Sequence, residues 1–314
     1  MIMYKMLVTD LDGTLLDDDK KIPEINIQSI KRLHQDFGII PVIATARPLE
    51  VARYIAKQGG KEFEGYIIAT NGAILMDLQK EECLINQSLS PEQIQALINV
   101  CKENGLEYEC MTTKCEVADA SYSYRRVIDP MYDNMGLPFN YQEDLESYMM
   151  SLEDSIPLFA VNGTEEELDE AYSKLSQISG LQISGRCTRT TPGVDEQGKI
   201  ETICYHDIMQ EGVTKAMAIE TLANHLGIEK REIIAIGDGG NDIEMLQEAG
   251  LKIAMKNASD ELKKVANIVT VKDNNHGGVG IVLNELHKVL ERRQDEAEKR
   301  RKRLENLEGI EPGD

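Results

Sequence analysis

Short apolar strands alternate with amphipathic helices at both ends of this chain, and this alternation restricts the fold more than any other feature. Residues 6–8, 39–44 and 66–69 are apolar runs of strand length, and a stretch with helical spacing of apolar residues follows the first run. The same order returns late in the chain, with an apolar run at 233–236 and a further strand near 252–255. Strands that are apolar on both faces are typical of parallel sheets with helices on both sides. We therefore expect an α/β protein.

The middle of the chain has a different pattern. Two helices there open with capping boxes, Ser90-x-x-Gln93 and Thr164-x-x-Glu167. Strand-like runs lie at residues 106–111, 157–161, 181–184 and 199–204. A turn-rich segment at 191–198 joins the last two runs. This pattern predicts a separate sheet with helices on one face.

These patterns divide the chain into three parts. We expect a discontinuous core domain at 1–82 and 209–290, an inserted α+β cap domain at 83–208, and a charged C-terminal tail at 291–314. Acidic residues of the tail stand four positions before basic ones, which favours an exposed helix. A tail that docks onto a partner is the alternative.

Composition argues against several classes of partner. The chain has 34 basic and 55 acidic residues, a formal charge of −21, so nucleic acids and anionic membranes are repelled on average. The first six residues do not resemble a signal peptide, and no run approaches the length of a membrane span. The six cysteines include no C-x-x-C pair, which favours reduced thiols. We expect a cytoplasmic protein without a nucleic-acid or membrane partner.

Polar residues stand directly after four of the apolar strands. These segments are Asp10-Leu-Asp12-Gly-Thr14, Thr45-Ala-Arg47, Asn71-Gly72 and Gly237-Asp-Gly-Gly-Asn-Asp242. In open parallel sheets, ligands bind at the carboxyl ends of the strands. Carboxylates gathered there repel one another and raise one another's pKa. A hard divalent cation such as Mg²⁺ relieves this repulsion and leaves room for a substrate phosphate.

The spacing of Asp10 and Asp12 suggests that the two acids have different roles in the reaction. Asp10 and Asp12 are two positions apart, so on an extended chain both side chains point the same way. One of them can serve as nucleophile and metal ligand while the other handles a proton. Gly13 lets the backbone turn closely past a ligand.

Four segments, taken in order, resemble the motifs of the haloacid dehalogenase (HAD) superfamily, and their arrangement is similar to that of its Cof-type phosphatases. Asp10-Leu-Asp12-Gly-Thr14 resembles the first motif, and Thr45 fits the second. Lys215 fits the third motif, and Gly237 to Asp242 the fourth. The resemblance covers about residues 3–290 and implies a Rossmann-like parallel-sheet core with an inserted α+β cap.

The resemblance also implies roles for the acids. Asp10 would attack phosphorus and form an aspartyl-phosphate, and Asp12 would protonate the leaving oxygen and then activate water. Mg²⁺ would be held by the Asp10 carboxylate, the Asp12 backbone carbonyl and Asp238. Asp242 would lie nearby or bind the ion through water.

Other residues would bind the substrate. Thr45 and Lys215 would contact phosphoryl oxygens and stabilise the charge of the transition state. Asn241, together with Asn71 and Gly72, would complete the part of the site that binds phosphate and faces the cap.

The chain departs from the family pattern at two positions. Ala46 stands where the second motif often has Gly, and Ala216 follows Lys215 where Gly is common. Neither departure removes a catalytic group, so we expect an active enzyme. Arg47 is interpreted as a structural or cap-gating residue rather than a catalytic one.

The cap is expected to set specificity by closing over the leaving group. Candidate contacts are Tyr122, Tyr124, Arg125 and Arg126. An ordinary polar surface is the favoured alternative for these four side chains.

These features predict a Mg²⁺-dependent phosphatase of small phosphorylated metabolites, such as sugar phosphates or phosphorylated cofactors and their precursors. A phosphomutase or phosphotransferase that uses the same nucleophile is the nearest alternative. A regulatory protein that binds a phosphorylated ligand without turnover is a third. The sequence leaves the substrate and the oligomeric state open.

Overall fold

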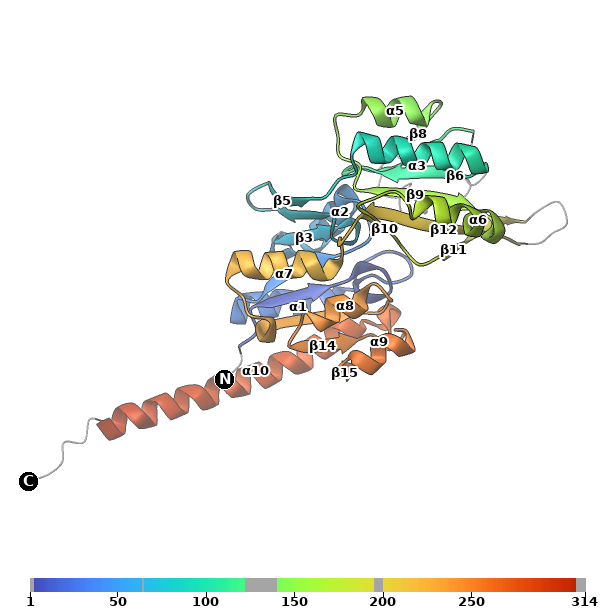
Figure 1. Ribbon diagram of the computed structural model, residues 1–314. Helices are drawn as coiled ribbons and strands as arrows, with labels where there is room; N and C mark the ends of the chain where they lie inside the picture. Colours follow the sequence, from blue (N-terminus) through green and yellow to red (C-terminus); the bar gives the residue numbers. More distant parts are fainter. Residues whose placement is uncertain (1–2, 64, 122–139, 195–199, 309–314) are drawn as a thin grey trace, which may run out of the picture.

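Figure 1 shows a computed structural model of the chain, which describes residues 3–63, 65–121, 140–194 and 200–308. Two sheets build two domains, and one long helix runs out of the core domain toward the C-terminus. The predicted α/β fold, with a parallel core and an inserted α+β cap, is confirmed.

The core domain is built on an eight-stranded sheet. Its strands are β1 (Met6–Thr9), β2 (Ile40–Ala44), β3 (Tyr66–Ala69), β4 (Ile74–Asp77), β5 (Glu82–Asn86), β13 (Ile233–Gly237), β14 (Leu251–Ala254) and β15 (Ile268–Val269). The order in the sheet is β15-β14-β13-β1-β2-β3-β4-β5. The pairs from β15 to β3 are parallel, and β4 and β5 add two antiparallel strands at one edge.

Helices bury this sheet. They are α1 (Glu24–Phe37), α2 (Leu49–Gly59), α7 (Lys215–Leu226), α8 (Asp242–Gln247), α9 (Asp260–Val265) and α10 (Gly278–Glu308). Every residue of β1 and of β13 is buried. Side chains alternate between the two faces of a strand, so complete burial requires cover on both faces. This is the reason that the central strands are apolar throughout.

The cap domain has a second sheet with helices packed on it. Its strands are β6 (Glu107–Met111), β7 (Glu116–Asp119), β8 (Asn140–Gln142), β9 (Leu158–Gly163), β10 (Leu181–Ile183), β11 (Cys187–Val194) and β12 (Ile200–Gln210). Its described helices are α3 (Pro91–Asn104), α5 (Leu145–Ser151) and α6 (Glu165–Leu175). Both predicted capping boxes form, at Ser90 and at Thr164. Figure 1 shows α3 and α5 on the side of the cap sheet away from the core.

The other face of the cap sheet turns toward the core domain. Met111, Leu158 and Met209 from this face pack with Ala73 and Val213 in a small apolar cluster. This cluster joins the two domains next to the carboxyl ends of the core strands.

Two details of the cap differ from the sequence patterns. The segment predicted as a turn at 191–198 begins as strand, because β11 continues to Val194 and pairs with β12. Backbone pairing with a long neighbouring strand outweighs the local turn preference of Pro192 and Gly193. β5 lies in the core sheet and β12 continues to Gln210, so the chain crosses between domains a few residues after each predicted boundary.

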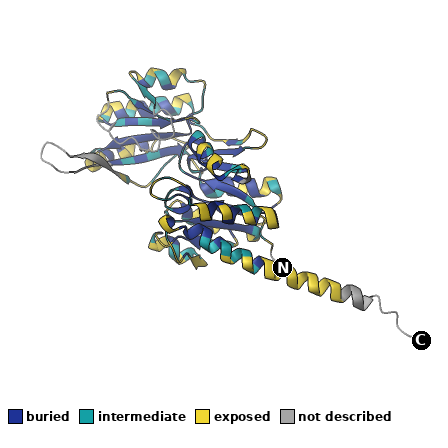
Figure 2. Ribbon diagram, turned by 180° about the vertical axis from the view of Figure 1, so that it is seen from behind, coloured by how far each residue is buried: buried dark blue, intermediate teal, exposed yellow. Residues whose placement is uncertain are grey.

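The charged tail continues the last helix of the core. Leu283 and Leu290 of α10 are buried, whereas residues 291–303 are exposed, as Figure 2 shows for the projecting part of the helix. One predicted pair of the tail forms, with Glu298 Oε1 2.8 Å from Lys302 Nζ. Among the described residues, no helix is both long enough and apolar enough to cross a membrane.

Candidate active site

Lys215 lies at the centre of the candidate site. It is the first residue of α7, and its side chain is 1% exposed. Its Nζ lies 2.5 Å from Asp10 Oδ1 and 2.7 Å from Asp242 Oδ1. Burial by itself lowers the pKa of this ammonium group, but the two carboxylates outweigh burial and raise the pKa above its usual value. The lysine is therefore a fixed, buried cation.

Asp10 follows β1 directly and is buried. Burial raises its pKa well above the usual value, and the nearby Asp242 and Asp238 raise it further. The charge of Lys215 offsets only part of this effect. The carboxylates thus carry more negative charge than the single lysine neutralises.

Asp238 follows β13 and completes the acidic cluster. Thr14 Oγ1 donates a hydrogen bond of 2.7 Å to Asp238 Oδ1. Burial, with a smaller contribution from Asp242, raises the pKa of Asp238 to about 6. The carboxylate also packs against the backbone of Gly13, where a Cβ atom would lie 2.3 Å from Asp238 Oδ2. Gly13 has φ +73°, so glycine is required here for both its conformation and its size.

The acidic cluster fits a divalent cation. Asp10, Asp238 and Asp242 each offer a carboxylate oxygen, and these three atoms lie within 4.8 Å of one another. All three are oxygen ligands, which Mg²⁺ prefers. Burial and the mutual repulsion of the acids raise the pKa values of Asp10 and Asp238, and a bound cation would offset that repulsion.

Asp242 also has a structural role, because it contacts both Lys215 and the loop after β13. Its Oδ1 accepts from Lys215, and its Oδ2 accepts the backbone N–H groups of Asp238 and Gly239 at 2.9 and 3.0 Å. With both oxygens engaged, Asp242 orients the lysine and the loop that carries Asp238.

Asp12 lies in a separate network. Arg47 donates two hydrogen bonds to it, Nε to Oδ2 at 2.5 Å and Nη2 to Oδ1 at 2.7 Å. Lys20 Nζ donates a third to Oδ1 at 2.7 Å. Burial raises the pKa of Asp12, but Arg47 and Lys20 outweigh burial and lower the pKa to about 2.

The two acids of the first motif therefore share no partner among these contacts. On an extended chain, the two-residue spacing of Asp10 and Asp12 predicts that both side chains lie on one side. In the structure Asp10 and Asp12 both have extended backbone angles (φ −68°, ψ 165° and φ −75°, ψ 127°), and the chain turns at Gly13 (φ +73°). Even so, the two carboxylates contact different cations: Asp10 contacts Lys215, and Asp12 contacts Arg47 and Lys20.

The residues predicted to bind phosphate lie around these networks. Thr45 is buried and its Oγ1 accepts the N–H of Arg47 at 3.1 Å. The backbone N–H of Asn71 donates to the carbonyl oxygen of Thr45 at 3.0 Å. Asn241 Nδ2 donates to Asn71 Oδ1, also at 3.0 Å. The loops after β2, β3 and β13 are thus linked.

Gly72 has a role that the sequence does not show. Its φ is +107°, and a Cβ atom there would lie 2.2 Å from the carbonyl oxygen of Thr214. Thr214 caps the N-terminus of α7 by accepting from Met217 N. Gly72 therefore lets the loop after β3 approach the helix that carries Lys215.

Sequence reasoning missed two site residues, Lys20 and Asn257. Asn257 Nδ2 donates to the carbonyl oxygen of Gly13 at 2.7 Å and so supports the turn after β1. Asn257 follows β14, so the rule that polar residues gather after parallel strands would have found it. Lys20 has no comparable signal. The predicted cap contacts Tyr122, Tyr124, Arg125 and Arg126 lie outside the described residues.

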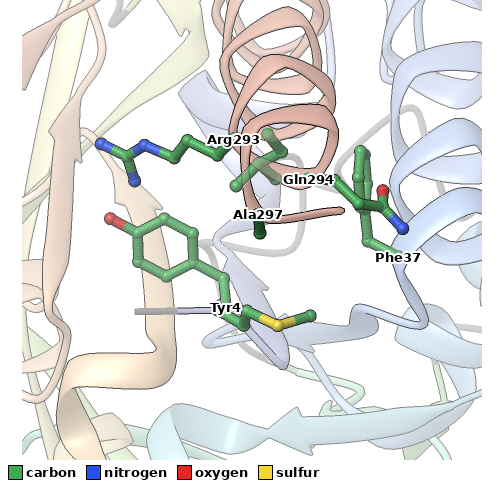
Figure 3. Close-up of a pocket in the computed structure, with 7 residues that line it drawn as sticks. Tyr4, Phe37, Arg293, Gln294 and Ala297 are labelled. Atoms are coloured by element: carbon green, nitrogen blue, oxygen red, sulfur yellow. The ribbon is translucent and has the colours of Figure 1, made fainter. Parts of the chain in front are cut away.

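An apolar pocket in another part of the described structure is not lined by carboxylates. Figure 3 shows it between the segment before β1 and α10, lined by residues such as Tyr4, Phe37, Leu290 and Ala297. Its volume is about 100 Å³. It lies beside the amino end of β1, whereas the acidic cluster lies at the carboxyl ends of the strands.

Comparison with known proteins agrees with this arrangement. The model of one family, haloacid dehalogenase-like hydrolases, matches residues 7–283. The chain belongs to this family. As a haloacid dehalogenase-like hydrolase it is an enzyme, and the resemblance drawn from the four motifs is confirmed. The family match ends before the exposed part of α10.

Individual relatives of this hydrolase match along nearly their whole length. The 5-amino-6-(5-phospho-D-ribitylamino)uracil phosphatase YitU of Bacillus subtilis is 29% identical, with 89% of this chain and 96% of that protein covered. The phosphoglycolate phosphatase of Methanopyrus kandleri is 28% identical over 92% and 98%. The crystal structure of TM0651 from Thermotoga maritima matches with a TM-score of 0.71 at 26% identity, covering 90% of this chain and 97% of that one.

Proposed function

We propose that the protein is a Mg²⁺-dependent phosphatase that hydrolyses phosphomonoesters of small metabolites through an aspartyl-phosphate on Asp10. The observation that carries the proposal is the buried contact between Asp10 and Lys215 inside a cluster of three carboxylates. Such a cluster pairs a nucleophile with a cation for the phosphoryl group. Relatives named as phosphatases of a phosphorylated ribitylaminouracil and of phosphoglycolate support a small phosphorylated substrate.

In the first step, an oxygen of Asp10 forms a bond to phosphorus while the bond from phosphorus to the leaving oxygen breaks. Asp12 gives a proton to that leaving oxygen. Lys215 and the Thr45 hydroxyl bind phosphoryl oxygens and stabilise their growing charge. Mg²⁺, held by Asp10, Asp238 and the Asp12 backbone carbonyl with Asp242 beside them, would supply further charge stabilisation when bound.

In the second step, water attacks phosphorus, Asp12 accepts a proton from that water, and Asp10 is released. Arg47 and Lys20 hold Asp12 in the ionised form, which is the form that this second step needs. The first step requires a protonated Asp12, and the negative charge of a bound phosphate favours that form while Arg47 and Lys20 hold the carboxyl group in place.

We also propose that the protein acts in the cytoplasm, free of nucleic acid and membrane. All six cysteines are free thiols in the structure, which suits a reducing compartment.

A substrate panel tests the proposed function. Purified protein is incubated with phosphorylated metabolites, and free phosphate is measured with Mg²⁺ and with EDTA. We expect release from a few related compounds, abolished by EDTA. Phosphate moved between hydroxyl groups with little free phosphate would indicate a mutase. Tight binding without release would indicate a regulatory protein.

A further inference from the structure

We propose that Lys20 is a positioning residue for Asp12, and that the turn at residues 17–21 is built to hold its ammonium group there. The inference rests on the proposed phosphatase function, in which Asp12 carries the proton. Lys20 lies eight positions after Asp12, outside the four motifs.

The backbone at Lys20 is strained. Its φ is +60°, in the left-handed region that residues with a side chain rarely adopt. Hydrogen bonds of the turn hold it there: Lys20 N donates to Asp17 O at 3.0 Å, and Asp17 N donates to Lys21 O at 2.9 Å. Strain of this kind persists only where the surrounding structure enforces it, and it gathers at functional sites.

The turn is also fixed to the core from outside. Asp18 N donates to Asn275 Oδ1 at 2.9 Å, and Asn275 Nδ2 donates back to Asp18 Oδ2 at 2.8 Å. The buried Asn274 donates to Asp18 Oδ1 and to the carbonyl oxygen of Leu16, both at 3.1 Å. Two asparagines about 257 positions away therefore set where the turn lies.

Lys20 and Arg47 reach Asp12 from different loops. Arg47 binds both carboxylate oxygens and fixes the plane of the group. Lys20 binds Oδ1 alone, so it distinguishes one oxygen from the other. Together they hold the carboxylate in one orientation beside the acidic cluster.

A plain surface ion pair is the alternative, because the Lys20 side chain is 34% exposed. A surface ion pair does not require a left-handed backbone or a turn tied to distant asparagines. The neighbouring Lys21 has ordinary backbone geometry and is exposed, which makes it a matched control.

Kinetics of Lys20→Met and Lys21→Met test the proposal. Two substrates are used with Mg²⁺: p-nitrophenyl phosphate, whose leaving group needs little protonation, and an alkyl phosphate from the panel, whose leaving group needs it strongly. We expect Lys20→Met to lower kcat on the alkyl phosphate by about tenfold or more with little change in KM, and to lower it less on p-nitrophenyl phosphate. Lys20→Arg restores part of the rate, and Lys21→Met behaves as wild type.

Equal losses on both substrates, a loss confined to KM, or equal effects of Lys20→Met and Lys21→Met would overturn the proposal. If wild-type protein releases phosphate from neither substrate, the phosphatase function fails, and the positioning role falls with it. Active wild-type protein with an unaffected Lys20→Met variant overturns the positioning role alone.

Thermal unfolding of Lys20→Gly against Lys20→Met tests the strain separately. Both variants lose the ion pair, but only glycine adopts a φ of +60° freely. We expect Lys20→Gly to unfold at the higher temperature while its kcat on the alkyl phosphate stays reduced. A lower unfolding temperature for Lys20→Gly would contradict a strained turn.

Discussion

Lys215 and Asp10 are 205 positions apart in the chain, yet their side chains meet at 2.5 Å, nitrogen to oxygen, in the interior of the protein. Lys215 stands where the chain returns from the cap to the core, and Asp10 stands where the first core strand ends. Lys215 therefore belongs both to the junction between the domains and to the candidate phosphate site.

Removal of the lysine charge should destabilise the protein strongly. Lys215→Met leaves two buried carboxylates without their counter-charge, so we expect a loss of about 3–5 kcal/mol in the free energy of unfolding. Urea unfolding in EDTA measures it, and Mg²⁺ should recover part of the loss. Lys230→Met, which breaks the exposed ion pair with Glu248, is the control and should change stability by less than about 1 kcal/mol. Similar effects of the two substitutions would contradict the electrostatic role of Lys215.

Substitution of Gly72 should impair activity through Lys215. Gly72→Ala places a methyl group 2.2 Å from the carbonyl oxygen of Thr214 and should displace the start of α7. Gly38→Ala is the matched control, because Gly38 also has a positive φ, of +68°, but its Cβ would meet no atom within 4 Å. We expect both variants to lose about 1–2 kcal/mol of stability from backbone strain, and Gly72→Ala to lose more. Phosphate release should fall only in Gly72→Ala, and a matching fall in Gly38→Ala would refute this account.

Mg²⁺ affinity should depend on pH through Asp238. Its pKa of about 6 in the metal-free protein lies above the ordinary 3.8, because burial and the neighbouring Asp242 raise it. Asp238 therefore favours the folded state below pH 3.8, and this contribution is lost as pH rises through about 6. Mg²⁺ binds the ionised form, so its affinity should fall by about tenfold for each pH unit below this pKa.

Calorimetric titration with Mg²⁺ between about pH 5 and 7 checks this dependence. Asp238→Asn should bind Mg²⁺ weakly, with a shallower dependence on pH. An affinity that stays constant over this range in wild-type protein would show that Asp238 does not bind the ion.

The strand pattern predicts where most of the candidate site residues lie in the fold. Asp10, Thr45, Asn71 and Asp238 each follow a buried parallel strand, and adjacent parallel strands bring their carboxyl ends to one edge. The hydrophobic pattern of each strand and the order of the strands along the chain can be read from the sequence without a structure. Lys215 came instead from the resemblance to the family motifs, because a lysine at a helix start has no distinctive pattern.

The contacts of Asp12 could not be predicted in the same way. Whether Lys20 reaches Asp12 depends on a left-handed backbone and on Asn274 and Asn275, which lie far along the chain. The strand at 187–194 was missed for a related reason, because its pairing with β12 is a tertiary property that outweighs local turn residues. In both cases, contacts between residues far apart in the sequence determine the local structure.

The exposed end of α10 should be dispensable for catalysis. It lies beyond the family match, and residues 291–303 are exposed. We expect deletion of residues 299–314 to leave kcat and KM unchanged and to shift Tm by no more than about 2 °C. Leu283→Ala, within the buried part of the same helix, should cost about 2–5 kcal/mol. A large loss of activity on deletion would show that the tail belongs to the working enzyme.

Trapping of the phosphoenzyme tests whether Asp10 carries the phosphoryl group during turnover. Protein turning over a substrate from the panel with Mg²⁺ is quenched in acid and digested, and its peptides are weighed by mass spectrometry. We expect a peptide that contains Asp10 and is heavier by one HPO₃ group. This peptide should be absent in Asp10→Asn, which should also release no phosphate. Rapid phosphate release by Asp10→Asn, or a phosphoryl group on another residue, would show that Asp10 is not the nucleophile.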